Sequence, residues 1–284
     1  MSKLFVVAVV CGGSLIFPLA GSAGAPGTVT CPQDTQSFSG TAFDLIVPED
    51  GFCTVTNATI THDVILQDDA GIQASQTSIG HNLTTGADGD VRLSQVRVGH
   101  DVNGGSDTDY HLELTTIGHD LVAFEPLTVQ TGRNSANSPG GPVNVGHDIS
   151  ITGSPDGEDF VFDGFCNLTV GHDLRITNRW VTLGMNVGDT CSGRGVPAIG
   201  VGHDLVLTGD SALPGFFGPS ALEVGGNNVG HDLVFTGNSA VPGGYLEVAD
   251  NTVTGDAVCA SNTPAPSRDA GDGPNSVGGS DTCD

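Results

Sequence analysis

The sequence is poor in basic residues. It contains 33 Asp and Glu residues but only 8 Lys and Arg residues, and Lys3 is the only lysine. Nucleic-acid phosphates are bound through Lys and Arg, so this balance excludes nucleic acid as a partner. It also disfavours an anionic polysaccharide substrate, whereas divalent cations suit a formal net charge of -25. The plainer role of such a surface is solubility, because like-charged chains repel one another.

Long apolar segments are also scarce. The one extended run goes from Leu4 to about Ala20, after Lys3 and before a Gly-Ser-Ala triplet that ends at Ala23. A basic start, an apolar stretch and small residues at the cleavage point are typical of a secretory signal peptide. We therefore predict a signal peptide at residues 1–23, with an uncleaved membrane anchor as the alternative. A secreted or surface location follows, with no membrane association after signal removal.

Cysteine is infrequent, and one of the seven cysteines lies inside the predicted signal peptide. An even number of the remainder in an exported chain indicates disulfides, although sequence alone allows several connectivities and free buried thiols are the alternative. The simplest scheme pairs neighbours in sequence. The expected pairs are Cys31–Cys53, Cys166–Cys191 and Cys259–Cys283.

One pentapeptide recurs along the chain. "VGHDL" occurs at 170–174, 201–205 and 229–233, and close variants precede it. Eight of the nine histidines therefore recur at one position of a repeat, and the first four are separated by 19 residues each. These eight are His62, His81, His100, His119, His147, His172, His203 and His231. A ninth unit has Gly255 at the histidine position.

The repeat predicts the fold class. A unit of 19 residues is too short for a pair of helices. Its apolar residues alternate with period two, as in Val201-x-His203-x-Leu205, among Gly, Thr, Asn and Asp. We predict an all-β chain that forms a single-stranded parallel β-helix (a β-solenoid), right-handed and of about nine coils, with rungs about 4.8 Å apart.

The composition divides the chain beyond the signal peptide into three parts. Residues 24–60, which include Cys31 and Cys53, are predicted to form an N-terminal cap, because an open solenoid end exposes a sheet edge. Residues 61–259 hold the repeats. Residues 260–284 are rich in Gly and Pro and are predicted to form a flexible tail.

The later repeats carry Gly- and Pro-rich insertions at one phase of the coil, so we expect loops along one side of the rod. Aromatic and acidic residues near these insertions form a candidate ligand-binding face: Trp180, Phe216, Phe217, Tyr245, Asp159 and Asp163. Arg175 and Arg179 lie close to this set in sequence, and a glycosidase-like patch is one interpretation of it. A solvated loop is the other.

The repeat resembles a known kind of protein. Units such as Val253-x-Gly255-Asp256, and the Thr-Gly-Asn at 236–238, resemble secreted β-helix repeat proteins of actinomycetes whose function is uncharacterised. The pattern is also similar, more distantly, to the polymer-forming β-helices of the bactofilin type. The resemblance covers roughly residues 54–259 and implies a β-helix without implying a function. Bactofilins are cytosolic and lack signal peptides and disulfides, so polymer formation is not carried over.

The repeated histidines have three interpretations. Strict alternation along a strand would point them inward, beside the core. A histidine at a solenoid corner would stack on its neighbour as a structural ladder, and His, Asn and Asp tolerate unusual corner backbone angles. Alternatively, neighbouring imidazoles could share Zn²⁺ or Cu²⁺. The Asp directly after each histidine forms a ladder of its own, which could cap backbone N–H groups at the corner or bind Ca²⁺, and a second acidic line seven residues past the histidines supports Ca²⁺. The candidate metal ligands are His62, His81, His100, His119, Asp69, Asp88 and Asp107. The glycine-rich calcium nonapeptide is absent, so Ca²⁺ is a weaker expectation than no cofactor.

No common catalytic motif of hydrolases, metalloproteases or phosphate-binding loops is present in the sequence, and no catalytic residue is assigned. We predict an exported, non-enzymatic structural or surface protein that presents loops on one face of the solenoid. A carbohydrate-binding or polysaccharide-cleaving β-helix is the main alternative, and a metal-binding or polymer-forming solenoid is another. The expected partners are extracellular polysaccharide, including that of the cell wall, or other copies of the chain.

Overall fold

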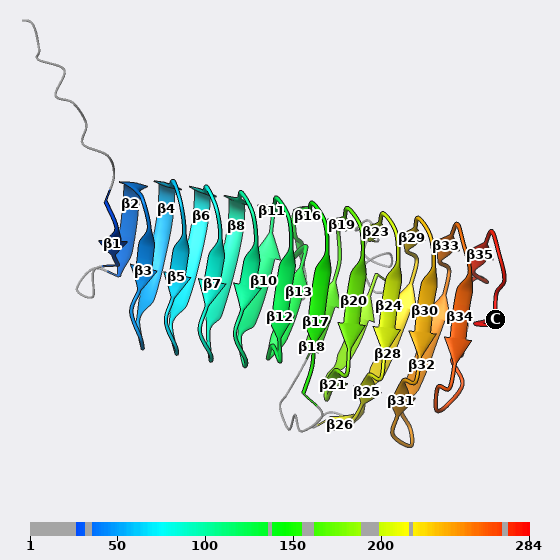
Figure 1. Ribbon diagram of the computed structural model, residues 1–284. Coiled ribbons are helices and arrows are strands. Elements are labelled where there is room, and N and C mark those ends of the chain that lie inside the picture. The colour runs from blue at the N-terminus through cyan, green and yellow to red at the C-terminus, as the bar shows by residue number, and fades with distance from the viewer. Residues whose placement is uncertain are drawn as a thin grey trace, which may run out of the picture.

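The chain forms a straight rod of stacked β-coils (Figure 1). The computed structural model describes residues 27–31, 36–135, 138–154, 162–188, 199–215, 218–268 and 272–284. These residues form strands and turns without a helix, and the two large sheets are parallel throughout. In the part of the chain so described, no helix has the length and hydropathy needed to span a bilayer. The predicted all-β parallel β-helix is confirmed. The predicted signal peptide at 1–23 lies outside the described residues.

Each coil contributes one strand to the first large sheet. In spatial order its strands are β1 (Val29–Thr30), β3 (Leu45–Val47), β5 (Val64–Leu66), β7 (Leu83–Thr85), β9 (Val102–Gly104), β12 (Leu121–Phe124), β17 (Ile149–Thr152), β20 (Leu174–Thr177), β24 (Leu205–Thr208), β30 (Leu233–Thr236) and β34 (Ala257–Ala260). Each strand pairs in parallel with the strand one coil away, so residues one repeat apart lie side by side.

The second large sheet covers the other two faces of the rod. It begins with the strands β2 (Ser37–Ala42), β4 (Phe52–Ile60), β6 (Gly71–Ile79) and β8 (Asp90–Val98). From β8 it divides into two rows. One row is β10 (Asp109–Glu113), β13 (Thr128–Thr131), β18 (Phe162–Phe165), β22 (Gly184–Val187), β28 (Ala221–Gly225) and β32 (Tyr245–Ala249). The other is β11 (Thr116–Ile117), β16 (Val143–Val145), β19 (Leu168–Val170), β23 (Gly200–Val201), β29 (Asn228–Val229), β33 (Thr252–Val253) and β35 (Ser276–Val277).

The division reflects a bend inside each coil. The long strands turn at Asn57, Gln76 and Gln95, whose φ angles of 51°, 49° and 56° lie in the left-handed region. In the next coil Leu114, with φ 48°, separates β10 from β11 at the same point. Each regular coil therefore has three faces, with one corner at this bend.

The core is a column of aliphatic side chains supplied by the pentapeptide. The last residue of each unit lies on its equivalent one coil away, as in the register Val64, Leu83, Val102, and each of these side chains is fully buried. The first residue of each unit, such as Val98 and Ile117, is also buried. Burying one such side chain contributes about 1.5–3 kcal/mol, so each coil adds to the stability of its neighbours.

The segment predicted as a separate cap is part of the solenoid. Strands β1 and β3 extend the first sheet, and β2 and β4 extend the second. The first sheet therefore has eleven strands, more than the nine coils expected. Phe43 takes the histidine position and precedes Asp44, so a search for histidines does not detect this coil. The predicted disulfide Cys31–Cys53 is confirmed, with Cα atoms 6.1 Å apart.

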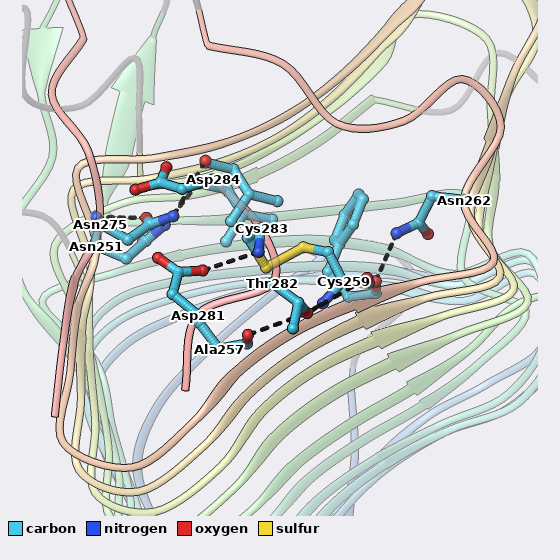
Figure 2. Close-up of a disulfide and its surroundings, with 12 residues drawn as sticks. Asn251, Ala257, Cys259, Asn262, Asn275, Asp281, Thr282, Cys283 and Asp284 are labelled. Atoms are coloured by element: carbon cyan, nitrogen blue, oxygen red, sulfur yellow. Dashed lines mark hydrogen bonds between the residues drawn. A yellow bond between two sulfur atoms is a disulfide. The ribbon is translucent and has the colours of Figure 1, made fainter. Parts of the chain in front are cut away.

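The segment predicted as a flexible tail continues the coil pattern as well. Strand β35 pairs with β33, and the backbone N–H of Gly279 donates to the carbonyl of Gly255 at 2.8 Å. The disulfide Cys259–Cys283 is confirmed and ties this last turn to β34 (Figure 2). Gly and Pro dominate the composition here, but backbone hydrogen bonds to the preceding coil do not depend on side chains. The third predicted pair involves Cys191, which lies outside the described residues.

The insertions build three small sheets. A parallel sheet joins β21 (Trp180–Val181), β25 (Ser211–Ala212) and β31 (Ser239–Ala240), which come from three consecutive coils and lie along one edge of the rod (Figure 1). Two hairpins pair β14 (Arg133–Ser135) with β15 (Ser138–Pro139), and β26 (Pro214–Gly215) with β27 (Gly218–Pro219). Insertions of three later coils therefore lie on one side of the rod, as expected, because their strands β21, β25 and β31 pair with one another.

Candidate functional site

The histidines occupy the corner that precedes each strand of the first sheet. Each ladder corner from His81 onward begins with the glycine of the pentapeptide, and the backbones of neighbouring coils touch there, whereas Thr61 takes that position before His62. A Cβ atom on Gly118 would lie 2.1 Å from the carbonyl oxygen of Gly99, and one on Gly146 would lie 2.2 Å from that of Gly118. Only glycine fits at such a distance, so these corners keep one shape and present the histidine that follows outward.

The eight repeated histidines form one continuous stack, which we call the histidine ladder. Consecutive rings have centroids 4.5–5.3 Å apart and are nearly parallel, with interplanar angles of 1–26°. The Phe43 ring continues the stack beyond His62, at 4.7 Å. The histidine side chains are 42–54% exposed, so they lie on the surface of the rod and not in its core. The ladder of corner histidines expected from the repeat is confirmed.

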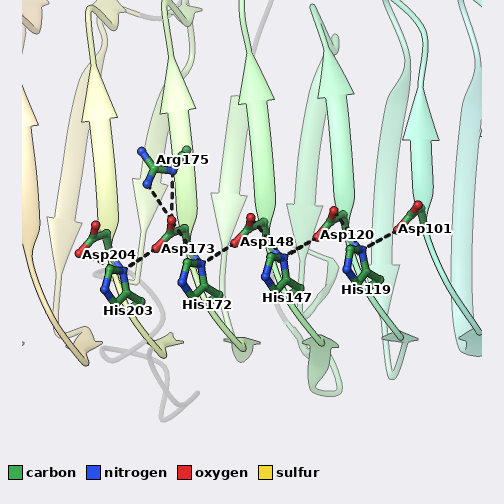
Figure 3. Close-up of polar contacts among 10 residues, drawn as sticks. All are labelled: Asp101, His119, Asp120, His147, Asp148, His172, Asp173, Arg175, His203 and Asp204. Carbon is green, nitrogen blue, oxygen red and sulfur yellow. Dashed lines mark hydrogen bonds and ion pairs between the residues drawn. The ribbon is translucent and has the colours of Figure 1, made fainter.

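The acidic residue that follows each histidine connects one coil to the next. Asp120 is typical, because its Oδ1 accepts the backbone N–H of Asp148 at 3.0 Å and lies 3.2 Å from Nδ1 of His147. Its Oδ2 lies 3.0 Å from Nδ1 of His119 in its own coil. Carboxylates and imidazoles therefore alternate along the edge (Figure 3). We call this combined row the His–Asp edge.

The carboxylates determine which ring nitrogen carries hydrogen. Every ladder histidine has its Nδ1 within 2.9–3.2 Å of an aspartate oxygen. An ionised carboxylate only accepts hydrogen bonds, so Nδ1 carries the hydrogen in these pairs. In the neutral ring Nε2 then keeps its lone pair. No hydrogen bond to a ladder Nε2 atom is found within the ranges that the structure describes.

One position interrupts the row of carboxylates. Asn82 stands where the other coils have Asp, and its Oδ1 accepts the backbone N–H of Asp101 at 3.0 Å. Its amide nitrogen lies 3.0 Å from Nδ1 of His81. His100 consequently contacts the carboxylate of its own coil, Asp101, at 2.9 Å. The corner hydrogen bond to the backbone is thus kept by an amide as well as by a carboxylate.

The edge shifts the pKa of several of its members. Burial alone would raise the pKa of Asp173, but hydrogen bonds from Arg175, from the backbone of Asp204 and from His203 outweigh it and lower the pKa to about 2. The pKa values of Asp44 and Asp101 are lowered for the same kind of reason. The hydrogen bond to Asp204 raises the pKa of His231. These shifts favour the ionised carboxylates and, at His231, the charged imidazole.

The seven residues predicted as metal ligands do not form one site. His62, His81, His100 and His119 belong to the ladder, whereas Asp69, Asp88 and Asp107 lie at the opposite end of β5, β7 and β9. The three aspartates have φ angles of 56°, 54° and 56° and occupy the tight turn after each strand. A three-residue strand separates the two corners, so their side chains point from different edges. The acidic partners of the histidines are instead the residues directly after them.

The predicted ligand-binding face is also corrected in part. Asp163 is fully buried and pairs with the buried Arg179, Nε to Oδ2 at 2.7 Å, so it is not available at the surface. The sequence placed Asp163 in a loop, but it lies in β18. Trp180 and Tyr245 are half-buried, and the Tyr245 hydroxyl donates to Glu223. Asp159, Phe216 and Phe217 lie outside the described residues.

Arg179 is the centre of a buried polar cluster that sequence reasoning did not identify. Its guanidinium also donates to the carbonyl of Leu127 at 3.2 Å, and its backbone N–H donates to Asp210 at 2.8 Å. Burial raises the pKa of Asp210 well above its ordinary value. Arg175 and Arg179 were grouped in sequence, but only Arg175 faces the His–Asp edge. The cluster connects several coils and adjoins β21 and β25, because Arg179 and Asp210 directly precede these strands.

Comparisons with protein-family models, with curated proteins and with solved structures found no match to this chain. The resemblance to actinomycete β-helix proteins and to bactofilins therefore stays a prediction. The fold rests on the coordinates, and the function has to be inferred from the geometry of the rod and its His–Asp edge.

Proposed function

We propose that this protein is an exported, non-enzymatic structural rod that serves at the cell surface or in the extracellular matrix. The observation that carries the proposal is the His–Asp edge. Its carboxylates accept backbone hydrogen bonds from the adjacent coil, as Asp148 does from Asp173 at 2.9 Å. In many enzymes carboxylates act as general acids and bases, but the carboxylates of this edge bind neighbouring coils to each other through hydrogen bonds.

The arrangement of the acidic residues supports a non-enzymatic role. Glycoside hydrolysis uses two carboxyl groups in one accessible groove, about 5–10 Å apart. Asp163, a predicted member of the ligand face close to the arginines in sequence, is fully buried, and so is Asp210. A polymer cannot reach them without unfolding the coil.

The two described disulfides support export. Disulfides persist in oxidising compartments and are rare where thiols are kept reduced. Cys31–Cys53 lies in the first coils and Cys259–Cys283 in the last, so both ends of the described solenoid are cross-linked. Reinforced ends suit a rod that has to last outside the cell.

A carbohydrate-binding role is the second candidate, favoured by one observation. An open groove runs along the bend between the second and third faces, and its walls include Gln76, Gln95, Arg97 and Thr116. Amide and hydroxyl groups repeated at rung spacing suit the hydroxyl groups of an extended neutral glycan. This groove lies in the first coils, whereas the described residues of the predicted ligand face, Asp163, Trp180 and Tyr245, belong to later coils.

The experiment that tests the proposal combines shape and activity. The chain without residues 1–23 is measured by small-angle X-ray scattering and incubated with neutral and acidic polysaccharides. A rod with a stacked region of roughly 50 Å, from eleven strands at the strand spacing, and no release of sugar ends would support the proposal. Release of sugar that persists after repurification would overturn it. A glycan array with the wild type and Gln95→Ala tests the second candidate function separately. Binding that the wild type shows and Gln95→Ala loses would indicate a glycan in the groove.

A further inference from the structure

We propose that the outer side of the histidine ladder binds divalent transition-metal ions of the Zn²⁺, Ni²⁺ and Cu²⁺ class through the Nε2 atoms of adjacent imidazoles. The outer side of the ladder is a surface that the structural role leaves unused. It does not depend on that role, because a rod without metal affinity would still be a rod.

The carboxylates of the edge orient each imidazole ring for metal binding. Histidines that bind metals usually donate their other N–H to a carboxylate, which fixes the tautomer and makes the ligand nitrogen more basic. Every ladder histidine has this support, as His172 has from Asp148 at 3.1 Å and His203 from Asp173 at 3.0 Å. The edge therefore presents a row of imidazoles already in the form that a metal requires.

The ladder imidazoles are accessible to ions in the solvent. The ladder side chains are about half exposed, from 42% at His203 to 54% at His231. A metal ion can approach these rings from solvent without opening the core. The strongly acidic chain, with a formal charge of -25, also raises the local concentration of cations.

Neighbouring imidazole rings lie close enough for two of them to bind one metal ion. Zn–N bonds are about 2.0–2.1 Å long, so two nitrogens of one ion lie no more than about 4 Å apart. His203 and His231 have the closest rings, with centroids 4.5 Å apart, and His172 and His203 follow at 4.8 Å. A small tilt about the inner Nδ1 contacts brings the outer nitrogens of such a pair within reach of one ion. Water molecules would complete the coordination.

The ligand chemistry selects the class of metal. Imidazole nitrogen suits Zn²⁺, Cu²⁺ and Ni²⁺, whereas Ca²⁺ requires several oxygen ligands. The aspartate oxygens of the edge already accept hydrogen bonds from the backbone and from Nδ1, as at Asp120. At least five His–Asp–His groups along the edge offer one ring nitrogen or carboxylate oxygen per residue within 4.8 Å of one another, for example His147, Asp148 and His172.

The experiment measures binding of Zn²⁺ or Ni²⁺ alone, by calorimetry and by equilibrium dialysis with elemental analysis. With two imidazoles per ion, the chain without residues 1–23 is expected to take up about four ions. The combined variant H147Q/H172Q/H203Q/H231Q should lose about half of this capacity. His111→Gln is the matched control, because His111 lies in β10 outside the ladder, and it should leave the capacity unchanged.

A second variant separates metal ligation from loss of structure. Asp173→Asn combined with Asp204→Asn keeps the imidazoles but removes both carboxylates near Nδ1 of His203, at 3.0 and 3.3 Å, and it should weaken metal binding at the His203 pair about 10-fold or more. Circular dichroism on each variant confirms that the coil is intact. The proposal is overturned if no saturable binding occurs, if the folded four-site variant binds as much metal as the wild type, or if Ca²⁺ binds equally well to the same histidines.

Discussion

Oδ1 of Asp173 accepts hydrogen bonds from Nδ1 of His203 at 3.0 Å and from the backbone N–H of Asp204 at 2.9 Å, although these residues are about 30 positions apart in sequence. Oδ2 of the same carboxylate receives the Arg175 guanidinium at 2.7 Å. One side chain thus joins two coils through three donors. The relationship is the strongest example of a contact that repeats along the His–Asp edge.

Asp173→Ala should lower the free energy of unfolding by roughly 1–3 kcal/mol, because the donors from Asp204 and His203 lose their acceptor. Urea denaturation followed by circular dichroism measures the change. Asp88→Asn is the matched control, since Asp88 lies in the turn at another edge, where asparagine tolerates its left-handed backbone. It should change stability by less than about 0.5 kcal/mol. Equal effects of the two substitutions would contradict the account.

The stability of the edge should depend on pH in two opposite ways. The pKa of Asp173 is lowered to about 2, so its contribution is present above about pH 4 and is lost as the pH falls toward 2. The pKa of His231 is raised, so its contribution is present below about pH 6.5 and is lost as the pH rises through the folded value. Both contributions are therefore present together between about pH 4 and 6.5.

Melting temperatures of the wild type and Asp173→Asn, measured from pH 2 to 9, check this dependence. The gap between the two proteins should narrow toward pH 2, where the wild-type carboxylate also becomes neutral. A gap that stays constant down to pH 2 would show that ionised Asp173 does not stabilise the fold.

Gly118→Ala should destabilise the rod by roughly 3 kcal/mol or more, because the new methyl group would overlap the backbone of the preceding coil. The Cβ position lies 2.1 Å from the carbonyl oxygen of Gly99. Gly200→Ala is the control, because no atom lies within 4 Å of its Cβ position. Thermal denaturation of both variants should show a large loss only for Gly118→Ala, and similar melting temperatures would argue against close contact at the corner.

Arg179→Met should be more damaging than the loss of a surface arginine. It leaves the buried carboxylate of Asp163 without its ion pair, which costs about 3–5 kcal/mol. Arg92→Met removes an exposed pair with Asp90 and should cost no more than about 1 kcal/mol. Comparison of the two by chemical denaturation measures the difference. If Arg179→Met is as mild as Arg92→Met, the buried cluster does not hold the coils together.

The sequence predicts the regular part of the fold well because each coil has to satisfy the same contacts. Gly99 and Gly118 have no room for a side chain, and Val102 and Leu121 have to fill the same column. A repeated pentapeptide is the direct result. The expected histidine stack follows from the same period, since equal positions on successive coils are neighbours.

The remaining features of the fold and of the site could not be predicted from the sequence. Leu45 and Val277 belong to coils whose corners have no histidine, so the repeat search ended before the solenoid did. Asp69 shares the period of His62, but period alone does not reveal which corner a residue occupies. Burial of Asp163 depends on Arg179, which is 16 residues away and one coil further along. Nothing in the local sequence of Asp163 distinguishes it from a surface acid.

The central claim is that each ladder imidazole donates its Nδ1 hydrogen to an aspartate, which holds the coils together and leaves Nε2 free of hydrogen. Long-range ¹H–¹⁵N NMR of labelled protein at about pH 8, above the ordinary pKa of histidine, reads the tautomer of every neutral ring directly. We predict the Nδ1–H form for all ladder histidines, including His147 and His203, with His111 as an independent signal. The Nε2–H form along the ladder would contradict the account.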